Sequence, residues 1–189
     1  VSSGLSENML DVASYRLATH LGLAFIILGF IIWYIFMMSL SEAEILARQR
    51  TRDQSIFGKS TGLMHFVFLQ ILIGALVAGI DAGRNYVDWP LMAGGFLPPD
   101  PFELSPWWRN FFEDDGLVQF MHRMIGYTLF FFCFFAWRRS RSSGNSTLKF
   151  SFNVILAIAI FQMMLGIATV MYAAPWEIAI IHQFGAILL

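Results

Sequence analysis

The residues with the clearest chemical potential are three histidines near the ends of long apolar segments. His20, His122 and His182 stand in YRLATHLGLAF, LVQFMHRMIGY and IAIIHQFGAIL. Each lies about five residues inside its segment, and with a helical rise of about 1.5 Å per residue all three have a similar, shallow depth. Ionisable side chains inside a membrane span are rare and usually functional, so these three are the first candidates for a site.

Histidines that face each other at matched depth are a common means of holding a haem iron from both sides in a helix bundle. Each imidazole binds the metal through a neutral nitrogen. His122 and His182 meet the condition of matched depth and are the candidate ligands. The alternative is a pair of buried histidines that are bonded to carbonyl groups or line a proton path.

Two arginines stand beside these histidines. Arg16 precedes His20 by one helical turn on the same face, and Arg123 directly follows His122. The propionates of a haem prefer the aqueous edge, and the arginine fork binds carboxylates well. We therefore expect both arginines to contact haem propionates, with ordinary snorkelling to the membrane surface as the alternative.

The roles of His20 and His65 are less clearly indicated by the sequence. His20 has no evident partner at its depth within this chain, so it is either structural or paired with a residue outside it. His65 enters its apolar segment from the opposite, basic side. We expect His65 to be structural or interfacial.

The elements that position these residues are membrane-spanning helices. Hydrophobic residues make up 57% of the chain and charged residues 13%, with a mean hydropathy of +0.63. A span needs about 20 apolar residues. Four segments qualify, namely Tyr15–Met38, Thr61–Ile80, Leu117–Trp137 and Leu148–Tyr172. A fifth begins at Ile178 but is too short to cross. The sequence predicts an all-α polytopic membrane protein. Because it starts without a methionine and stops inside a span, we expect a fragment.

The connecting segments differ in charge. Lys and Arg concentrate in Ser39–Lys59 and Arg138–Lys149, whereas acids concentrate in Asp81–Gly116 and near Glu7 and Asp11. The basic segments should face the cytoplasm or the mitochondrial matrix. The histidine side should then face the periplasm or the intermembrane space. The net charge of −1 gives no indication of nucleic-acid binding.

Smaller features complete the plan. SEAEILARQR predicts a short surface helix capped by Ser41. Four-residue spacings of small residues, such as Gly74 with Ala78, predict close helix packing rather than chemistry. The only cysteine, Cys133, should be a packing residue, and the absence of CxxCH indicates that any haem is bound without covalent attachment. The long segment Asp81–Gly116, with three tryptophans, is either interfacial or a lid over a site.

The motifs together resemble those of a known family. YRLATHLGLA, GALVAGIDAGRNYVDWPLM, LVQFMHRMIGY, FQMMLGIATVMY and IAIIHQFGAIL, in this order, resemble the haem A synthase family. The resemblance covers nearly the whole chain. The lack of a cysteine pair in the acidic-side segments resembles the mitochondrial and alphaproteobacterial branch.

The resemblance implies a fold of eight helices in two pseudo-symmetric four-helix halves, each with a haem between two histidines. This chain would cover about helices 4–8. Residues 1–40 would end the N-terminal, substrate-haem half, residues 41–60 would form a cytoplasmic or matrix linker, and residues 61–189 would form the C-terminal, cofactor-haem half.

The resemblance also implies roles for the site residues. His122 and His182, with Arg123, would hold the cofactor haem b. His20, with Arg16, would bind the haem O substrate or haem A product, and all three histidines would be iron ligands. The family glutamate proposed to act in catalysis belongs to a helix outside this chain. Gln119 occupies a related position in this half by pseudo-symmetry.

The implied activity is oxidation of a haem O methyl group to a formyl group, which gives haem A for cytochrome c oxidase. Implied partners are membrane lipid, an electron donor, haem O synthase, cytochrome c oxidase assembly factors and a second copy of the chain. The implied location is the mitochondrial inner membrane, with the bacterial inner membrane as the alternative. Two other functions remain open at this point: a non-enzymatic haem b electron-transfer subunit of a respiratory complex, and a transporter without haem.

Overall fold

A computed structural model describes residues 13–189, and the acidic residues Glu7 and Asp11 lie outside this range. The described chain is helical. Its elements are α1 (Ser14–Met38), α2 (Glu42–Arg50), α3 (Gln54–Gly79), η1 (Ala82–Arg84), η2 (Trp107–Arg109), α4 (Asn110–Glu113), α5 (Asp115–Ser140), α6 (Ser146–Met171) and α7 (Trp176–Gly185). Of these, α1, α3, α5 and α6 are long and apolar enough to cross a membrane, as the sequence predicted.

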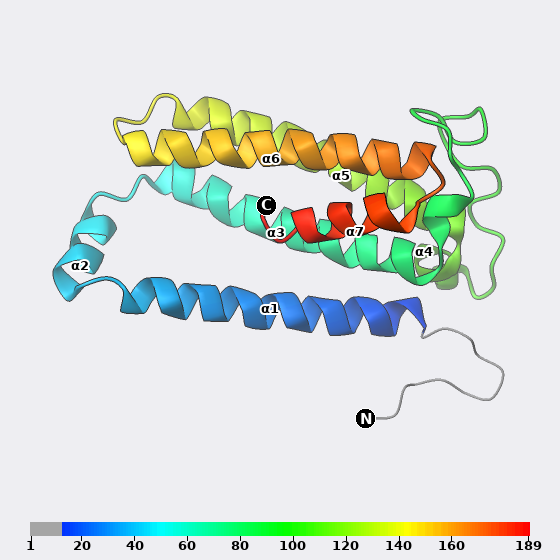
Figure 1. The fold of residues 1–189 in the computed structure, drawn as a ribbon, viewed down its shortest axis with the longest axis horizontal. Coiled ribbons are helices and arrows are strands. Elements are labelled where there is room, and N and C mark those ends of the chain that lie inside the picture. Colours follow the sequence, from blue (N-terminus) through cyan, green and yellow to red (C-terminus); the bar gives the residue numbers. More distant parts are fainter. Residues whose placement is uncertain (1–12) are drawn as a thin grey trace.

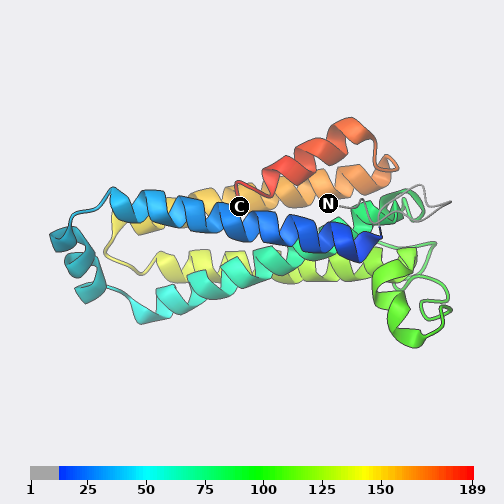
Figure 2. The ribbon, with the colours of Figure 1, turned by 90° about the horizontal axis from the view of Figure 1, so that it is seen from below.

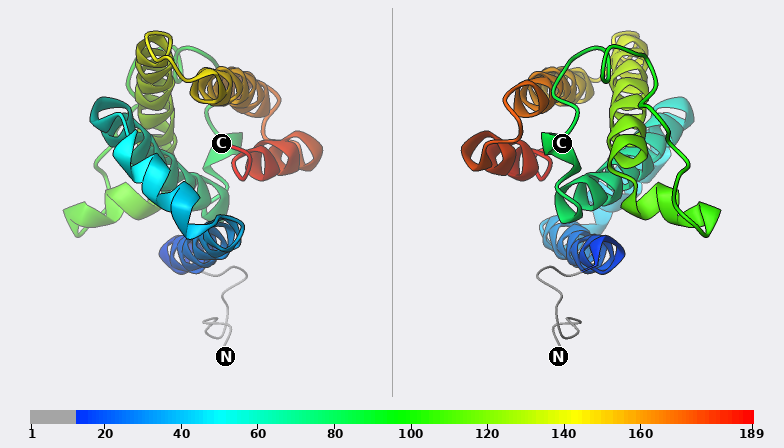
Figure 3. Two further views of the ribbon diagram at one scale, coloured as in Figure 1. Left: turned by 90° about the vertical axis from the view of Figure 1, so that its left-hand side faces the viewer. Right: turned by 90° about the vertical axis from the view of Figure 1, so that its right-hand side faces the viewer.

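The long helices run side by side in chain order (Figures 1 and 2). α1 packs on α3, α3 on α5, α5 on α6, and α6 on α7. The end views in Figure 3 show α1 at one edge of the bundle and α7 at another. In Figure 1, α2 and the α5–α6 connection lie at one end, and the α3–α5 connection and the α6–α7 turn lie at the opposite end. The basic and acidic segments are therefore separated by the length of the bundle.

Helix boundaries follow local capping. The short helix α2 is confirmed, and Ser41 and Glu44 form its capping box. α3 begins seven residues before the predicted Thr61, at Gln54, because the Asp53 carboxylate accepts the N–H groups of Ser55 and Ile56 and so starts a polar first turn. Hydropathy alone cannot detect such a polar extension of an apolar helix.

The core lies between α3, α5 and α6 towards the basic end. It includes Leu63, Leu129 and Phe152, and Cys133 is buried among them as a packing residue. A second cluster, including Ala18, Leu76 and Val118, joins α1, α3 and α5 near the acidic end. Many large apolar side chains on the outer faces are exposed. This pattern is expected of helices surrounded by lipid.

Small residues bring neighbouring helices close together. A Cβ on Gly79 would lie 2.9 Å from the Cα of Ser14, and one on Gly22 would lie 2.7 Å from Leu72 Cδ2. Close packing of α1 on α3 through small residues is thus present. Gly74 differs from the expectation that this spacing serves packing alone, because it lies against the ring of His122.

Candidate functional site

The side chains of His122 and His182 meet inside the acidic end of the bundle. His122 lies on α5, two turns from its start, and His182 lies on α7. Their ring centroids are 6.4 Å apart and their planes are perpendicular. The matched depth read from the sequence therefore corresponds to a real juxtaposition, although the two residues are 60 positions apart in a chain whose helices pack mainly on their sequence neighbours.

The spacing of the two rings fits a metal ion between them. Metal–imidazole bonds of about 2 Å on each side place the centroids of two opposed rings about 6 Å apart. Within the described residues, no cluster of three or more His, Cys, Asp or Glu side chains could hold a metal ion. A metal ion held by this pair would take its remaining ligands from outside the described residues, for example from a macrocycle.

A glutamine stands against each histidine. Gln70 of α3 donates its Nε2–H to the carbonyl oxygen of His122 at 3.0 Å, and the same nitrogen lies 3.1 and 3.2 Å from the two ring nitrogens. Gln162 of α6 donates its Nε2–H to the carbonyl oxygen of His182 at 3.1 Å. The Oε1 atoms of both glutamines and the Nδ1 atom of His182 are buried without a hydrogen-bond partner.

Glycines face both imidazole rings. A Cβ on Gly74 would lie 3.1 Å from Cε1 of His122, and a Cβ on Gly166 would lie 3.1 Å from Cε1 of His182. Any other residue would therefore press on the ring. The glycines on α3 and α6 therefore leave only backbone against each ring and let the neighbouring helix approach it closely.

Arg123 is buried, and its guanidinium group forms hydrogen bonds mainly with the α3–α5 connection. Its two terminal nitrogens donate to the carbonyl oxygens of Tyr86, Asp88 and Leu91 and to Oε1 of Gln119, at 2.8–3.1 Å. Four of its five N–H groups are thereby used. The fifth, on Nε, is buried and unpaired. This Nε–H is the donor that remains for a further acceptor such as a propionate.

Gln119 supports the same connection from one turn earlier on α5. Its Nε2 donates to the carbonyl oxygens of Ala82 and Tyr86 at 2.9 and 3.2 Å, and its side chain is almost completely buried. Trp89 adds a hydrogen bond from Nε1 to the Tyr127 hydroxyl at 2.7 Å. The connection is therefore fixed to the histidine-bearing end of α5, while Trp89, Trp107 and Trp108 keep exposed faces.

Two residues whose carbonyl groups accept from Arg123, Asp88 and Tyr86, also have side chains with shifted pKa values. The Asp88 carboxylate accepts the backbone N–H groups of Gly94 and Ala93, both at 3.0 Å, and these bonds hold its pKa below the ordinary value of 3.8. Burial raises the pKa of the Tyr86 hydroxyl, and the nearby charge of Asp115 adds to the effect.

His20 and Arg16 do not join the His122–His182 pair. Both are exposed on α1, whose buried residues Ser14, Ala18 and Gly22 face the bundle. His20 and Arg16 therefore lie on a face of α1 other than the one that packs on α3. His65 is exposed at the opposite level of α3, where its Nδ1 bonds to the Thr61 carbonyl oxygen at 2.7 Å, in keeping with a structural role.

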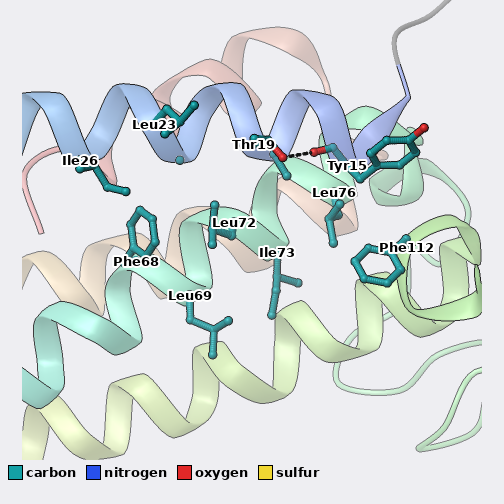
Figure 4. A pocket seen from close by; sticks show the side chains of 12 residues that line it. Tyr15, Thr19, Leu23, Ile26, Phe68, Leu69, Leu72, Ile73, Leu76 and Phe112 are labelled. Carbon is teal, nitrogen blue, oxygen red and sulfur yellow. Dashed lines mark hydrogen bonds between the residues drawn. The ribbon is translucent and has the colours of Figure 1, made fainter. Parts of the chain in front are cut away.

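An apolar groove of about 430 Å³ runs between α1 and α3 (Figure 4). Tyr15 and Thr19 lie at one end of it, joined by a hydrogen bond from the Thr19 hydroxyl to the Tyr15 carbonyl, and Ile26 and Phe68 lie towards the other. No histidine lines it. We therefore place the candidate chemistry at the histidine pair and not in this groove.

The sequence reading missed Gln70, Gln162 and Gly166. A signal was present, because QILIG at 70–74 and QMMLG at 162–166 share a Gln and a Gly four residues apart on the second and fourth apolar segments. Amides in membrane helices commonly bond across helices, but the pattern alone does not say which carbonyl each will reach.

The helices and the paired histidines define a class, multi-pass membrane proteins with a bis-histidine site at one end of the bundle. The sequence profile of the cytochrome oxidase assembly protein family, COX15-CtaA, matches residues 1–189. The chain therefore belongs to this family.

Several alphaproteobacterial relatives named Heme A synthase are similar to the chain. The protein from Ruegeria pomeroyi is 57% identical over 189 residues, which cover 99% of this chain and 50% of that protein. The protein from Paracoccus denitrificans is 49% identical over 189 residues, covering 100% and 50%. The chain thus spans about half the length of the curated relatives that it matches. No solved structure matches it.

Proposed function

We propose that this chain is part of a haem A synthase, which oxidises a methyl group of haem O to a formyl group and so supplies haem A to cytochrome c oxidase. The observation that carries the proposal is the juxtaposition of His122 and His182, whose ring centroids are 6.4 Å apart, a spacing that suits one metal ion between them. Identity of up to 57% to proteins named Heme A synthase supports the same reading.

We assign His122 and His182 to a haem b that serves as a cofactor. The two imidazoles would hold the iron of such a haem, which when bound would supply one-electron transfer. The protein contributes orientation and burial. α5 and α7 present the two rings close together, and Gln119 and Arg123 attach the α3–α5 connection to that end of α5.

We assign His20 and Arg16 to the substrate haem O, or the product haem A, in the other half of the protein. Their exposure on the outer face of α1 supports this division, because a partner histidine must come from residues outside this chain. Residues 1–40 then belong to the substrate half, residues 41–60 to the linker, and residues 61–189 to the haem b half. The proposed partners are an electron donor, haem O synthase, assembly factors of cytochrome c oxidase and a second copy of the chain.

The proposed location is the bacterial inner membrane. The alphaproteobacterial relatives favour it over the mitochondrial inner membrane that the sequence first implied. The basic segments, including α2, would face the cytoplasm, and the histidine pair would lie near the periplasmic face.

The test is a haem analysis of the purified full-length protein and of His122→Ala and His182→Ala variants. We expect haems B, O and A in the wild type. Either variant should lose the low-spin haem b absorption and keep some substrate haem, whereas the matched control His65→Ala should keep both. Haem B alone would indicate an electron-transfer subunit, and full haem b in both alanine variants would refute the ligand assignment.

A further inference from the structure

The two histidines of the pair sit in matching helix–helix units. In the first unit, Gln70 and Gly74 of α3 face His122 and Gly126 of α5. In each unit a glutamine donates to the histidine carbonyl, and a glycine one turn further along the same helix lies against the imidazole. The same plan thus occurs twice, once for each candidate ligand.

The second unit uses the corresponding residues of α6 and α7. Gln162 and Gly166 face His182 and Gly185, and a Cβ on Gly185 would lie 2.4 Å from Nε2 of Gln162. On α5, a Cβ on Gly126 would lie 3.2 Å from Nε2 of Gln70. Each glutamine therefore reaches the histidine carbonyl only because the histidine-bearing helix has a glycine about one turn after the histidine.

The hydrogen-bond inventory of the two units is incomplete in the same way. Oε1 of Gln70 and Oε1 of Gln162 are both buried and unpaired. A buried acceptor without a donor destabilises a folded protein, so two equivalent cases at one site require an explanation.

A metal-bound histidine supplies the missing donor. When one ring nitrogen binds a metal, the other keeps its N–H and almost always donates it to an acceptor, which orients the ring and raises its basicity. The buried Nδ1 of His182 is unpaired, and the Gln70 amide already lies 3.1 Å from Nδ1 of His122. The terminal amide torsion of glutamine is broad, so rotation about it can turn Oε1 of Gln70 towards the ring that Nε2 already contacts, and Gln162, which bonds to the His182 carbonyl, has the same freedom.

We propose, on the basis of the haem pair assigned above, that Gln70 and Gln162 are positioning residues. Each Nε2 holds the carbonyl of its histidine and so sets the rotation and depth of the helix that bears it. Each Oε1 accepts the remaining imidazole N–H when the opposite ring nitrogen binds the iron. The two amides then tune the electron density that the imidazoles give to the metal.

The test is a redox titration of the full-length, haem-loaded protein with Gln70→Leu, Gln162→Leu, Gln70→Glu and Gln162→Glu. Loss of the acceptor in the Leu variants makes the imidazole less basic and the ferric state less stable, so the midpoint potential should rise. Haem b affinity should also fall about ten- to a hundredfold. A Glu side chain retains an acceptor oxygen, so the potential should stay equal to the wild type or fall below it.

The control is Gln183→Leu, which changes an exposed glutamine next to His182 and should shift neither quantity. A shift of the same sign in the Leu and Glu variants, or lower affinity without any shift in potential, would overturn the proposal and reduce the glutamines to packing residues. Should the Leu variants take up no haem, an elevated potential in the Glu variants would overturn it equally. Absence of haem b from the wild-type protein would instead refute the proposed function itself.

Discussion

Arg123 illustrates how a buried charge can serve the backbone. Its terminal nitrogens bond to three carbonyl oxygens of the α3–α5 connection and to Gln119, so the guanidinium replaces the hydrogen bonds that this irregular segment lacks. Irregular backbone near a membrane requires such compensation. The propionate contact proposed from the sequence would fall to the remaining Nε–H, because the four terminal N–H groups already hold the connection.

We expect Arg123→Leu to loosen this connection at its attachment to α5. Loss of the four bonds should cost about 3 kcal/mol locally, which makes opening about a hundredfold more frequent. Hydrogen exchange of residues 82–92 would measure the change. Arg123→Lys should recover only part of the protection, because an ammonium group lacks the planar fork. Arg109→Leu, which removes the surface pair with Glu113, is the control and should change little; equal effects in both would contradict this role.

The lowered pKa of Asp88 leads us to expect that the stability of the same connection depends on pH. Its folded-state pKa lies below 3.8 because the carboxylate accepts the N–H groups of Gly94 and Ala93. A depressed pKa means that the stabilisation is present above the unfolded value and is lost as the pH falls through the folded one. Protection of the two amides, corrected for intrinsic exchange, should be constant from pH 7 to about 4 and fall below it. Asp88→Asn should abolish this fall; an unchanged profile in that variant would assign it to another group.

At the scale of helices, the site depends on two crossings in which glycine replaces a side chain. α3 passes His122 at Gly74, and α6 passes His182 at Gly166. The position of each histidine in the sequence sets the depth of its ring in the bundle. The position of the ring across the bundle depends on how closely the neighbouring helix approaches it. Glycines on the neighbouring helices permit that approach.

We expect Gly74→Ala and Gly166→Ala to weaken haem b binding without preventing membrane insertion. The new methyl groups would lie 3.1 Å from Cε1 of the rings, which must move. Overpacking of this kind costs about 1–3 kcal/mol, or roughly a five- to 150-fold loss of haem affinity. Haem titration of the apoprotein would measure it. Gly58→Ala on α3, where a Cβ meets nothing within 4 Å, is the matched control; equal affinity in all three variants would show that the rings tolerate the contact.

The helices and the histidine depths were predictable because both follow from patterns along a single chain. Apolar length located α1, α5 and α6 to within a few residues, and counting from the acidic side placed His122 and His182 at one level. The carbonyl partners of Arg123 and Gln70 were not predictable. Every residue carries a carbonyl, so the sequence contains no mark that distinguishes the carbonyl that will be reached.

At the scale of the molecule, α1 is attached to the bundle by one face only. The side towards α3 carries Ser14, Ala18 and Gly22, and the opposite side carries His20 with exposed apolar side chains such as Ile27 and Ile31. This arrangement suits a helix that belongs to the substrate half and meets the haem b half along a narrow strip of small residues.

We expect the two histidine sites to respond independently. His20→Ala should abolish haem A formation and weaken substrate-haem binding, and leave the haem b spectrum unchanged, because His20 lies on the outer face of α1 whereas His122 and His182 lie on α5 and α7. Arg16→Leu should lower substrate-haem affinity about ten- to a hundredfold, with partial recovery in Arg16→Lys. Haem-to-protein ratios would decide; normal haem A output from His20→Ala would contradict the assignment.

The order of the helices also has a consequence for how the protein is made. One candidate ligand is on α5 and the other on α7, which follows α6 after a short turn at 172–175. A ribosome that has delivered α5 and α6 into the membrane has produced a bundle with a single histidine at the site. The pair comes into being only when α7 inserts, so the proposed haem capture at this site would follow synthesis of the last described helix and could not guide the insertion of the earlier ones.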